Sequence, residues 1–478
     1  MKADKIEKRE RNSRPKRLLL LSIMALSFFI FQNARASAGY NSHFGVLVNP
    51  YMEDWDKPDK TTKLLKELSV KLVISKLAWK DVEPEKGKFS QKGWTKYDEL
   101  VNRLTGLGIE VTPFISATPQ WAIDPKLSPS NWKGRKFGPP AKNPEDVAAF
   151  FTQVVKRYKD KIKFWILYNA PQNRNHWIKP KVLAEMYRQA RQVLDKVQPE
   201  GKLILSGLEG AKTQGIPYLK KFLKAGGGKY VDIYDFHMIL GGDTLSETEF
   251  NTIQYKKVLG RYGEGSKSIQ YGAFALPSEF TPSENLIGTL KQKGWKPNDY
   301  SPMTPEQQAK NLVKIMVLGR SLGVERIYWG RTRDYALASG VAYNKYMKTT
   351  EKQRDKTGVL MERTHGIVDF DYKAKPSFSA FKVLIQKLDK ADVYRNMNFG
   401  ENGKGVIFKD GGKFTGIFFT WEKEKTVTFR SSAKDIKVID LYGKGKETVP
   451  VKDGKFQLKI SSAPIYVEGD LHDLSIAE

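Results

Sequence analysis

The sequence predicts an α/β fold, a (β/α)8 TIM barrel, followed by a small antiparallel all-β C-terminal domain. Two observations lead to this prediction. Through most of the chain, apolar runs of strand length alternate with amphipathic helical stretches, whereas after residue 390 short strands follow one another. Alternation of the first kind is typical of a parallel sheet covered by helices, and eight such units favour a closed barrel over an open doubly wound sheet.

Eight apolar runs are expected to form the barrel strands. Each run is continuously apolar, as expected for strands that are buried on both faces. The strands are expected at 43–49, 71–79, 109–116, 163–170, 202–209, 230–239, 268–276 and 325–331. Helices are expected between them at 97–107, 144–157, 180–197, 216–225 and 305–322. Pro144 and Pro305 lie near two of the helix starts, where proline is well tolerated.

Residues 1–38 are expected to be a signal peptide outside the fold. Residues 1–17 are rich in Lys and Arg, Leu18 to Phe31 is apolar, and Ala36-Ser37-Ala38 resembles a cleavage site. The apolar run is shorter than the roughly 20 residues that span a bilayer. We therefore expect a periplasmic or secreted protein, with an uncleaved inner-membrane anchor as the alternative. The basic flank argues against a buried helix.

The remaining chain divides into a barrel at 39–390 and a β domain at 391–478. Asp410-Gly411-Gly412 and Asp453-Gly454 are typical of hairpin turns between short strands. No low-complexity linker separates the two parts, so the β domain is expected to pack directly on the barrel.

Composition excludes several classes of chemistry. The 478 residues include no cysteine, which excludes disulfides, thiolate metal sites and cysteine nucleophiles. The five histidines are scattered without metal-ligand spacing, and neither a dinucleotide loop nor a P-loop is present where one would be needed. We therefore expect no cofactor and no metal.

The chain is strongly basic, with a net charge of +28. Residues 1–38 contain nine basic and three acidic side chains, which leaves +22 for the rest. Such an excess attracts polyanions such as acidic polysaccharide, lipid head groups or nucleic acid. No basic motif with interleaved aromatics indicates nucleic acid, and a membrane contact is expected only through an uncleaved N-terminus. A solvated, lysine-rich surface is the alternative reason for the charge.

Five segments in a fixed order carry a resemblance to a known family. They are WKDVEPEKGKFS (79–90), LGIEVTPFISATPQWA (107–122), YNAPQNRNHW (168–177), YDFHMI (234–239) and SPMTPEQQAKNLVKIMVLGRSLGVERIYWG (301–330). Together they resemble a clan A glycoside hydrolase, most similar to family 39, over about residues 43–388. The resemblance implies a (β/α)8 barrel with two catalytic Glu residues, at the ends of strands four and seven, and β-linked sugar substrates.

The resemblance also implies that both catalytic carboxylates are missing. Ala170 stands where relatives have the acid/base Glu of an Asn-Glu-Pro sequence, and Ala273 in QYGAFAL stands at the nucleophile position. Retaining hydrolysis needs both carboxyl groups, because a methyl group can neither transfer a proton nor form a glycosyl ester. We therefore predict a catalytically inactive pseudoenzyme that binds a polysaccharide or oligosaccharide. With two negative charges lost from a basic protein, an anionic glycan would be tolerated.

Three alternatives to a natural pseudoenzyme remain open. One is an active hydrolase or transglycosylase with relocated carboxylates, for which Glu209 and Glu279 are the candidates; Asp235 and Asp334 also lie near strand ends. A second is an engineered inactive double mutant, and a third is an envelope scaffolding protein. Neighbouring positions also depart from the family pattern, which favours natural drift over engineering. Ile74 stands where the family pattern has a basic residue, and Ile239 stands where it has an aromatic residue. Gly272 and Ala275, beside Ala273, also differ from that pattern.

Aromatic and polar residues at strand ends are candidates for binding sugar. Indole faces pack on the apolar faces of sugar rings, and nearby polar groups bind the hydroxyls. The resemblance implies a sugar contact for Asn169 and a pocket position for His237. The candidate aromatics are Trp79, Trp121, Trp177 and Trp329. Packing at the barrel's C-terminal end is the alternative for each Trp, and a core histidine is the alternative for His237.

Overall fold

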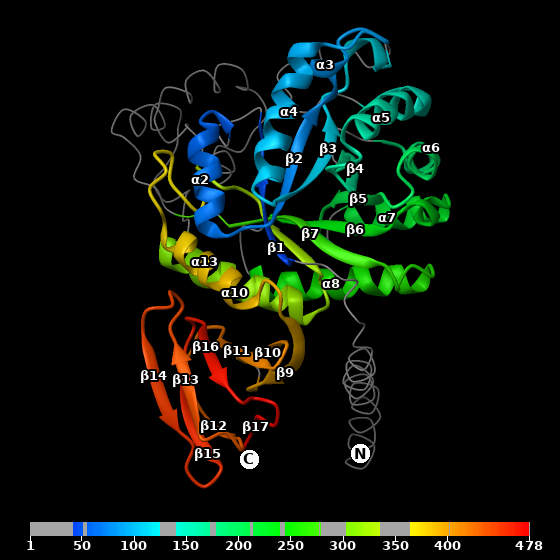
Figure 1. Cartoon of the computed structure of the whole chain (residues 1–478). Helices are drawn as coiled ribbons and strands as arrows, with labels where there is room; N and C mark the ends of the chain where they lie inside the picture. The colour runs from blue at the N-terminus through cyan, green and yellow to red at the C-terminus, as the bar shows by residue number, and fades with distance from the viewer. Residues whose placement is uncertain are drawn as a thin grey trace, which may run out of the picture. The chain divides into compact units, whose positions relative to one another are not determined.

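Eight parallel strands close into a barrel in the order β1 to β8, so the predicted fold is confirmed (Figure 1). In this computed structural model the described residues are 42–50, 55–124, 140–172, 178–210, 214–239, 244–276, 278, 303–334, 364–400 and 402–477. The predicted signal peptide lies outside them. The barrel strands are β1 Phe44–Val48, β2 Leu72–Ala78, β3 Glu110–Ser116, β4 Phe164–Asn169, β5 Lys202–Leu208, β6 Ile233–Ile239, β7 Ser268–Ala275 and β8 Arg326–Trp329.

Helices surround the barrel because their apolar faces cover the outward side chains of the strands (Figure 1). They are α2 Pro58–Leu68, α3 Trp79–Val82, α4 Gln91–Gly106, α5 Pro144–Tyr158, α6 Pro180–Val197, α7 Gly215–Lys224, α8 Thr244–Arg261, α10 Pro305–Ser321 and α13 Pro376–Leu388. The start of α10 is fixed by a capping box, in which Thr304 and Gln307 each bind the other's backbone N–H. None of the described helices is long and apolar enough to cross a membrane.

Side chains of the barrel strands alternate between the outer core and the barrel interior. In β2, Val73 and Leu77 belong to the cluster shared with the helices. Leu72, Ile74 and Lys76 therefore point to the opposite face, into the barrel. The same reasoning places Asp235 and His237 of β6 inside, because Phe236 and Met238 lie in the outer cluster.

Residues after α13 form two antiparallel sheets, as predicted. One sheet has six strands in the order β14-β13-β16-β11-β10-β9, and the other has three in the order β15-β12-β17. The strands are β9 Asp392–Asn398, β10 Gly403–Asp410, β11 Lys413–Thr420, β12 Lys425–Arg430, β13 Asp435–Ile439, β14 Lys446–Pro450, β15 Lys455–Ile460, β16 Ile465–Gly469 and β17 Ser475–Ile476. Phenylalanines at 399, 418, 429 and 456 pack between the sheets.

The β domain packs on α10 and α13 of the barrel (Figure 1). Phe408 and Phe419 belong to the same hydrophobic cluster as Phe381 of α13. Lys314 of α10, itself buried, donates to the Trp421 carbonyl at 3.3 Å. One hydrophobic cluster therefore extends from the barrel into the β domain, which agrees with the lack of a linker in the sequence.

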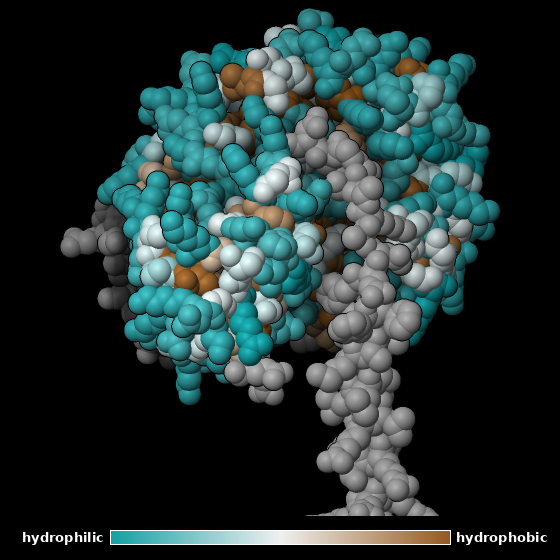
Figure 2. All heavy atoms as spheres, turned by 60° about the horizontal axis from the view of Figure 1, so that its bottom comes forward, coloured by the Kyte–Doolittle hydropathy of each residue, from teal (hydrophilic) through white to brown (hydrophobic). Residues whose placement is uncertain are grey.

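The outer surface matches the charged composition of the chain. On the face that Figure 2 shows, hydrophilic residues cover most of the described part, and hydrophobic residues lie in small separate patches. Scattered patches of this kind are normal for a soluble surface and do not by themselves mark a binding site.

Candidate functional site

The site predicted from the sequence lies at the end of the barrel where the strands finish, called the mouth below. Ala170 follows β4 and has φ +50°, a left-handed conformation that non-glycine residues rarely adopt. Gly207 of β5 makes room for it, because a Cβ on Gly207 would lie 2.2 Å from the Ala170 nitrogen. Ser206 Oγ donates to Asn169 Oδ1 at 3.2 Å, and Gln172 Nε2 donates to the Gly207 carbonyl at 2.8 Å. These contacts fix the end of β4 against β5.

Ala273 lies on β7, beside His237 of β6. The two residues are paired across the strands, and pairs in a sheet point to the same face, so Ala273 also faces the interior. The His237 side chain is 10% exposed. Burial lowers the pKa of His237 to about 4, so the imidazole is neutral at neutral pH. A neutral His at the mouth can either donate or accept a hydrogen bond from a sugar hydroxyl.

A buried carboxylate lies beneath these two positions. Asp235 of β6 has no exposed surface; its Oδ1 accepts from the Gly207 N–H at 3.3 Å and its Oδ2 accepts from Gln270 Nε2 at 2.6 Å. A Cβ on Gly272 would lie 1.9 Å from Oδ2. Gly272, interpreted from the sequence as drift beside Ala273, is therefore required by the close approach of Asp235. Burial raises the pKa of Asp235 to about 7 although these hydrogen bonds oppose the shift.

Replacing this carboxylate is expected to remove a pH dependence of stability. The Asp235 pKa is raised to about 7, so its contribution to stability is complete below about pH 4 and is lost as the pH rises through 7. A shift of this size corresponds to about 4 kcal/mol. Asp235→Asn should abolish that decline. The new amide can donate to Gln270 Oε1, which has no partner among the described groups, once the Gln270 amide flips.

The measurement is the free energy of unfolding in denaturant between pH 4 and 8. Asp160→Asn, in an exposed turn, is the control and should follow the unchanged protein. A decline of equal steepness in Asp235→Asn and the unchanged protein would show that another group causes it.

Two of the four candidate tryptophans are packing residues in this structure. The Trp79 side chain is fully buried, stacks on Phe150 with 4.9 Å between ring centroids, and donates from Nε1 to Glu83 Oε2 at 2.7 Å. Trp329 is also fully buried and donates from Nε1 to the His365 carbonyl at 2.8 Å. Their indole faces are covered by protein, so the expectation that they contact sugar is not supported, and the packing alternative describes both.

Among the candidate tryptophans that the structure describes, Trp121 keeps an exposed surface at the barrel mouth. It contacts Trp79 edge-on at 5.6 Å and donates from Nε1 to the Glu83 carbonyl at 3.0 Å. The Lys86 ammonium lies 5.6 Å from the Trp121 ring centroid. Glu83, which the sequence did not single out, thus positions both indoles. Trp177 lies outside the described residues.

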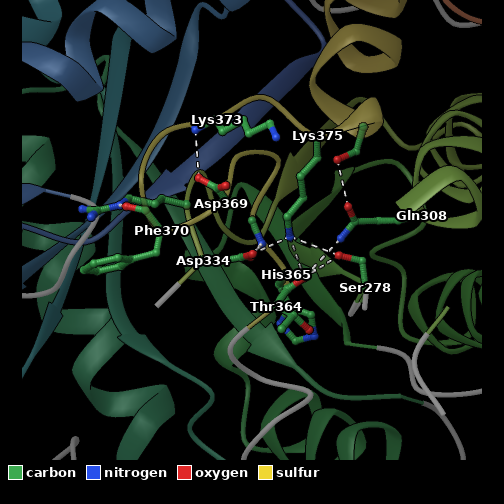
Figure 3. Close-up of polar contacts among 12 residues, drawn as sticks. Ser278, Gln308, Asp334, Thr364, His365, Asp369, Phe370, Lys373 and Lys375 are labelled. Carbon is green, nitrogen blue, oxygen red and sulfur yellow. Dashed lines mark hydrogen bonds and ion pairs between the residues drawn. The ribbon is translucent and has the colours of Figure 1, made fainter. Parts of the chain in front are cut away.

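The carboxylates considered as substitutes have different environments. Glu209 follows β5, is partly exposed, and accepts a hydrogen bond at its backbone carbonyl from the Tyr255 hydroxyl. Glu279 lies outside the described residues. Asp334, after β8, is buried in an ion pair with Lys375 (Figure 3). Asp235 and Asp334 are therefore committed to internal contacts.

The Asp334–Lys375 pair belongs to a polar cluster that joins β7, β8 and α13 (Figure 3). Lys375 Nζ lies 2.6 Å from Asp334 Oδ2 and donates to Ser278 Oγ at 3.1 Å and to the Thr364 carbonyl at 3.3 Å. Asp334 Oδ1 accepts from the Gly366 N–H at 2.8 Å. Burial raises the pKa of Asp334 to about 6 even though Lys375 lowers it. Within the described residues, no group of three His, Asp or Glu side chains is arranged to hold a metal.

Several solved structures with a similar fold are glycoside hydrolases. A family 39 glycoside hydrolase from the gut symbiont Bacteroides cellulosilyticus WH2 aligns over 90% of this chain and 81% of its own, with a TM-score of 0.64 and 18% identity. A family 30 endoxylanase from Clostridium papyrosolvens C71 aligns over 90% and 96%, with a TM-score of 0.57 and 10% identity. A glucosidase from Croceicoccus marinus aligns over 90% and 95%, with a TM-score of 0.57 and 12% identity.

These similarities show the class of fold that the chain adopts. The alignments cover 90% of the chain, so they include strands of the β domain as well as the barrel. The chain therefore has a glycoside hydrolase-like fold, a (β/α)8 barrel with a C-terminal β domain. No protein-family profile matches the sequence.

Proposed function

We propose that this protein is exported and binds a polysaccharide at the barrel mouth without cleaving it. The observation that carries this proposal is the pair of alanines at the two strands that bear the catalytic Glu residues in the resembling family. Ala170 follows β4 and Ala273 lies on β7, beside Asn169 and His237 respectively. The polar residues that would bind sugar are thus retained next to side chains that cannot carry out hydrolysis.

An active hydrolase with relocated carboxylates is the second candidate. Asp235 is fully buried with both oxygens hydrogen-bonded, and Asp334 is held by Lys375. Glu209 and Glu279 therefore remain as candidates for the missing catalytic carboxylates. A retaining hydrolase needs two carboxyl groups about 5–5.5 Å apart. This candidate predicts slow cleavage that disappears in Glu209→Gln or Glu279→Gln. An envelope scaffold, the third candidate, predicts a bound protein partner and no sugar binding.

Binding without cleavage is tested with the mature chain, from residue 39, on a panel of immobilised polysaccharides that includes xylan, β-glucans and polyuronates. The expected result is saturable binding to at least one of them, and no release of reducing ends during prolonged incubation. Release of reducing ends by the unchanged protein would contradict the proposal in favour of an active enzyme. Absence of binding across the panel, together with capture of an envelope protein, would favour the scaffold.

Trp121→Ala is expected to weaken this binding about two- to tenfold, taking a loss of about 0.5–1.5 kcal/mol, the size of a contact between two aromatic rings. Phe89→Ala is the matched control, because Phe89 is also an exposed aromatic but stacks on Trp94 of α4. Affinities for the glycan found in the panel are measured by titration calorimetry. If Trp121→Ala and Phe89→Ala bind that glycan equally well, Trp121 does not contact it.

A further inference from the structure

Lysines gather at the end of the barrel opposite the mouth, called the base below. Three helix ends and the connections that follow them lead into β4, β5 and β6, and together they form the basal patch, residues 155–163, 194–202 and 221–232. The patch contains ten Lys and Arg against four Asp and Glu. The four corresponding segments before β2, β3, β7 and β8 contain six against three; they are 65–71, 103–109, 258–267 and 318–325. Most of the positive excess at the base therefore lies in the basal patch.

Charged groups that contact the basal patch from outside do not change its balance. Asp98 and Glu264 reach it with negative charge, and Arg191 and Lys267 reach it with positive charge. Two of the four acids inside the patch are paired with Arg191 and so are already neutralised. The patch thus keeps an excess of positive charge after its neighbours are counted.

The lysines of the basal patch are open to solvent. Lys161 donates to Asn102 Oδ1 at 2.5 Å, and Lys202 pairs with Asp232 at 3.4 Å. Within the described residues, the patch lysines that are exposed and form no ion pair are Lys156, Lys159, Lys161, Lys163, Lys196, Lys221, Lys224 and Lys229. The helix dipole favours cations in the last turn of a helix, but this effect does not reach Lys161 or Lys229 in the connections.

Hydrogen bonds hold two of these connections side by side. The buried Gln198, which follows α6, donates from Nε2 to the carbonyls of Lys159 at 2.8 Å and Ile162 at 2.7 Å. The Lys202 N–H donates to the Lys163 carbonyl at 2.8 Å. The lysines therefore extend from backbone segments whose positions are fixed, so their charges stay together on one surface.

The chain also enters the fold at the base. β1 begins at Phe44 and runs toward the mouth, so Ser42 lies at the base. Asp389 holds this entry point, because its Oδ1 accepts from Ser42 Oγ at 2.7 Å and from the His43 N–H at 3.0 Å. Ten residues separate Ser42 from Phe31, the end of the apolar run in the sequence, and they can span at most about 35 Å. If that run stays in a membrane, the base is the end of the barrel tethered to it.

We propose that the basal patch binds an anionic phospholipid surface and that the mouth then points away from the membrane. Lysines near an anionic leaflet are attracted by its negative surface potential, each by about fivefold in partitioning. The connection between the base and the apolar run of the sequence favours lipid over a soluble polyanion as the occupant. This orientation would leave the mouth open to a glycan, but binding to lipid does not depend on the proposed function.

The test is cosedimentation of the mature chain, from residue 39, with lipid vesicles. This chain lacks the apolar run, so any binding comes from the folded part. The vesicles are pure phosphatidylcholine, or phosphatidylcholine with about one-third phosphatidylglycerol, whose head group is anionic. We expect binding to the anionic vesicles at about 0.05 M salt, its loss at about 0.5 M salt, and none to the neutral vesicles.

Charge neutralisation assigns the binding to the basal patch. The triple variant Lys159→Gln, Lys161→Gln and Lys163→Gln should weaken partitioning about 100-fold, at about fivefold for each lysine. The matched control makes the same charge change at exposed lysines of the β domain and should bind like the unchanged protein. This control combines Lys437→Gln, Lys446→Gln and Lys455→Gln.

A fluorescent label reports which end of the barrel faces the lipid. The chain has no cysteine, so one introduced cysteine gives a single site for the label. Pro199→Cys places it in the basal patch, and Gln91→Cys places it at the start of α4, toward the mouth; both positions are exposed. With a quencher attached to the lipid head groups, we expect quenching at position 199 and little at position 91.

Each other outcome contradicts the proposal in a distinct way. Equal binding to neutral and anionic vesicles, or equal loss in the two triple variants, would show that the basal patch does not bind lipid. Quenching at position 91 instead of 199 would mean that the mouth faces the membrane. If the basal triple variant loses binding to a soluble polyuronate while no vesicle binds the unchanged protein, the patch serves a polysaccharide. Glycan binding at the mouth should be unchanged in that variant, so failure of this proposal leaves the proposed function standing.

Discussion

Restoring both carboxylates is expected to give the protein measurable glycosidase activity. The double variant Ala170→Glu with Ala273→Glu supplies an acid/base and a nucleophile at the ends of β4 and β7. General acid catalysis alone contributes about 10²–10⁴-fold, and the covalent step is added to it. We expect the double variant to hydrolyse aryl β-glycosides at least about 10²-fold faster than the unchanged protein. Each single variant should hydrolyse them at about the rate of the unchanged protein.

The structure favours tolerance of both substitutions. Ala170 already holds φ +50°, so a longer side chain there adds no backbone strain beyond the cost that the chain already bears. Gly207 keeps the facing strand clear of this turn. Ala273 is buried, and overpacking at such a position typically costs about 1–3 kcal/mol, which a large domain can bear.

The matched control is Ala170→Gln with Ala273→Gln, which adds the same volume without an acid or a nucleophile. Activity is measured with chromogenic β-glucosides and β-xylosides and with the glycan that the unchanged protein binds. If the glutamate pair folds, still binds glycan and turns over no faster than the glutamine pair, Ala170 and Ala273 do not correspond to the catalytic positions.

The elements of the barrel could be predicted from sequence because each is encoded locally. The run 71–79 became β2 at Leu72–Ala78, and the helix expected at 180–197 has those bounds. The helix expected at 97–107 begins earlier, at Gln91, with Ser90 capping it. Gly93 made this helix start hard to predict from the sequence, because glycine disfavours helices in general. In the structure a Cβ at position 93 would lie 1.9 Å from the Asp81 carbonyl oxygen. The glycine is therefore required by a tertiary contact, which the local sequence does not reveal.

The interior of the mouth was less predictable, because it depends on register. Shifts in the ladder next to His237 and between Tyr271 and Phe274 decide which side chains face inward. Counting along the sequence therefore interpreted Gly272 as drift instead of as space for Asp235. Trp79 and Trp329 lie at strand ends as predicted, but their burial, which favours the packing alternative, is set by neighbours far away in the chain.

Breaking the buried ion pair at the mouth is expected to have the largest effect on stability. Lys375→Met removes the cation that faces Asp334 and leaves a buried carboxylate with the Gly366 N–H as its remaining described donor (Figure 3). Removing one partner of a buried pair costs about 3–5 kcal/mol, since the other charge stays desolvated and uncompensated. The double variant Asp334→Leu with Lys375→Met should recover most of that loss, because neither charge then remains buried.

The measurement is the free energy of unfolding at pH 7.5, above the Asp334 pKa of about 6, where the carboxylate is charged. Lys88→Met is the control; Lys88 pairs with Glu85 at 2.6 Å, but both side chains are exposed, so its loss should cost less than about 1 kcal/mol. At pH 5 the carboxylate is mostly protonated, and the penalty of Lys375→Met should shrink. A penalty as small as that of Lys88→Met at pH 7.5 would mean that water reaches Asp334, and the cluster would then be an exposed part of the mouth, open to ligand.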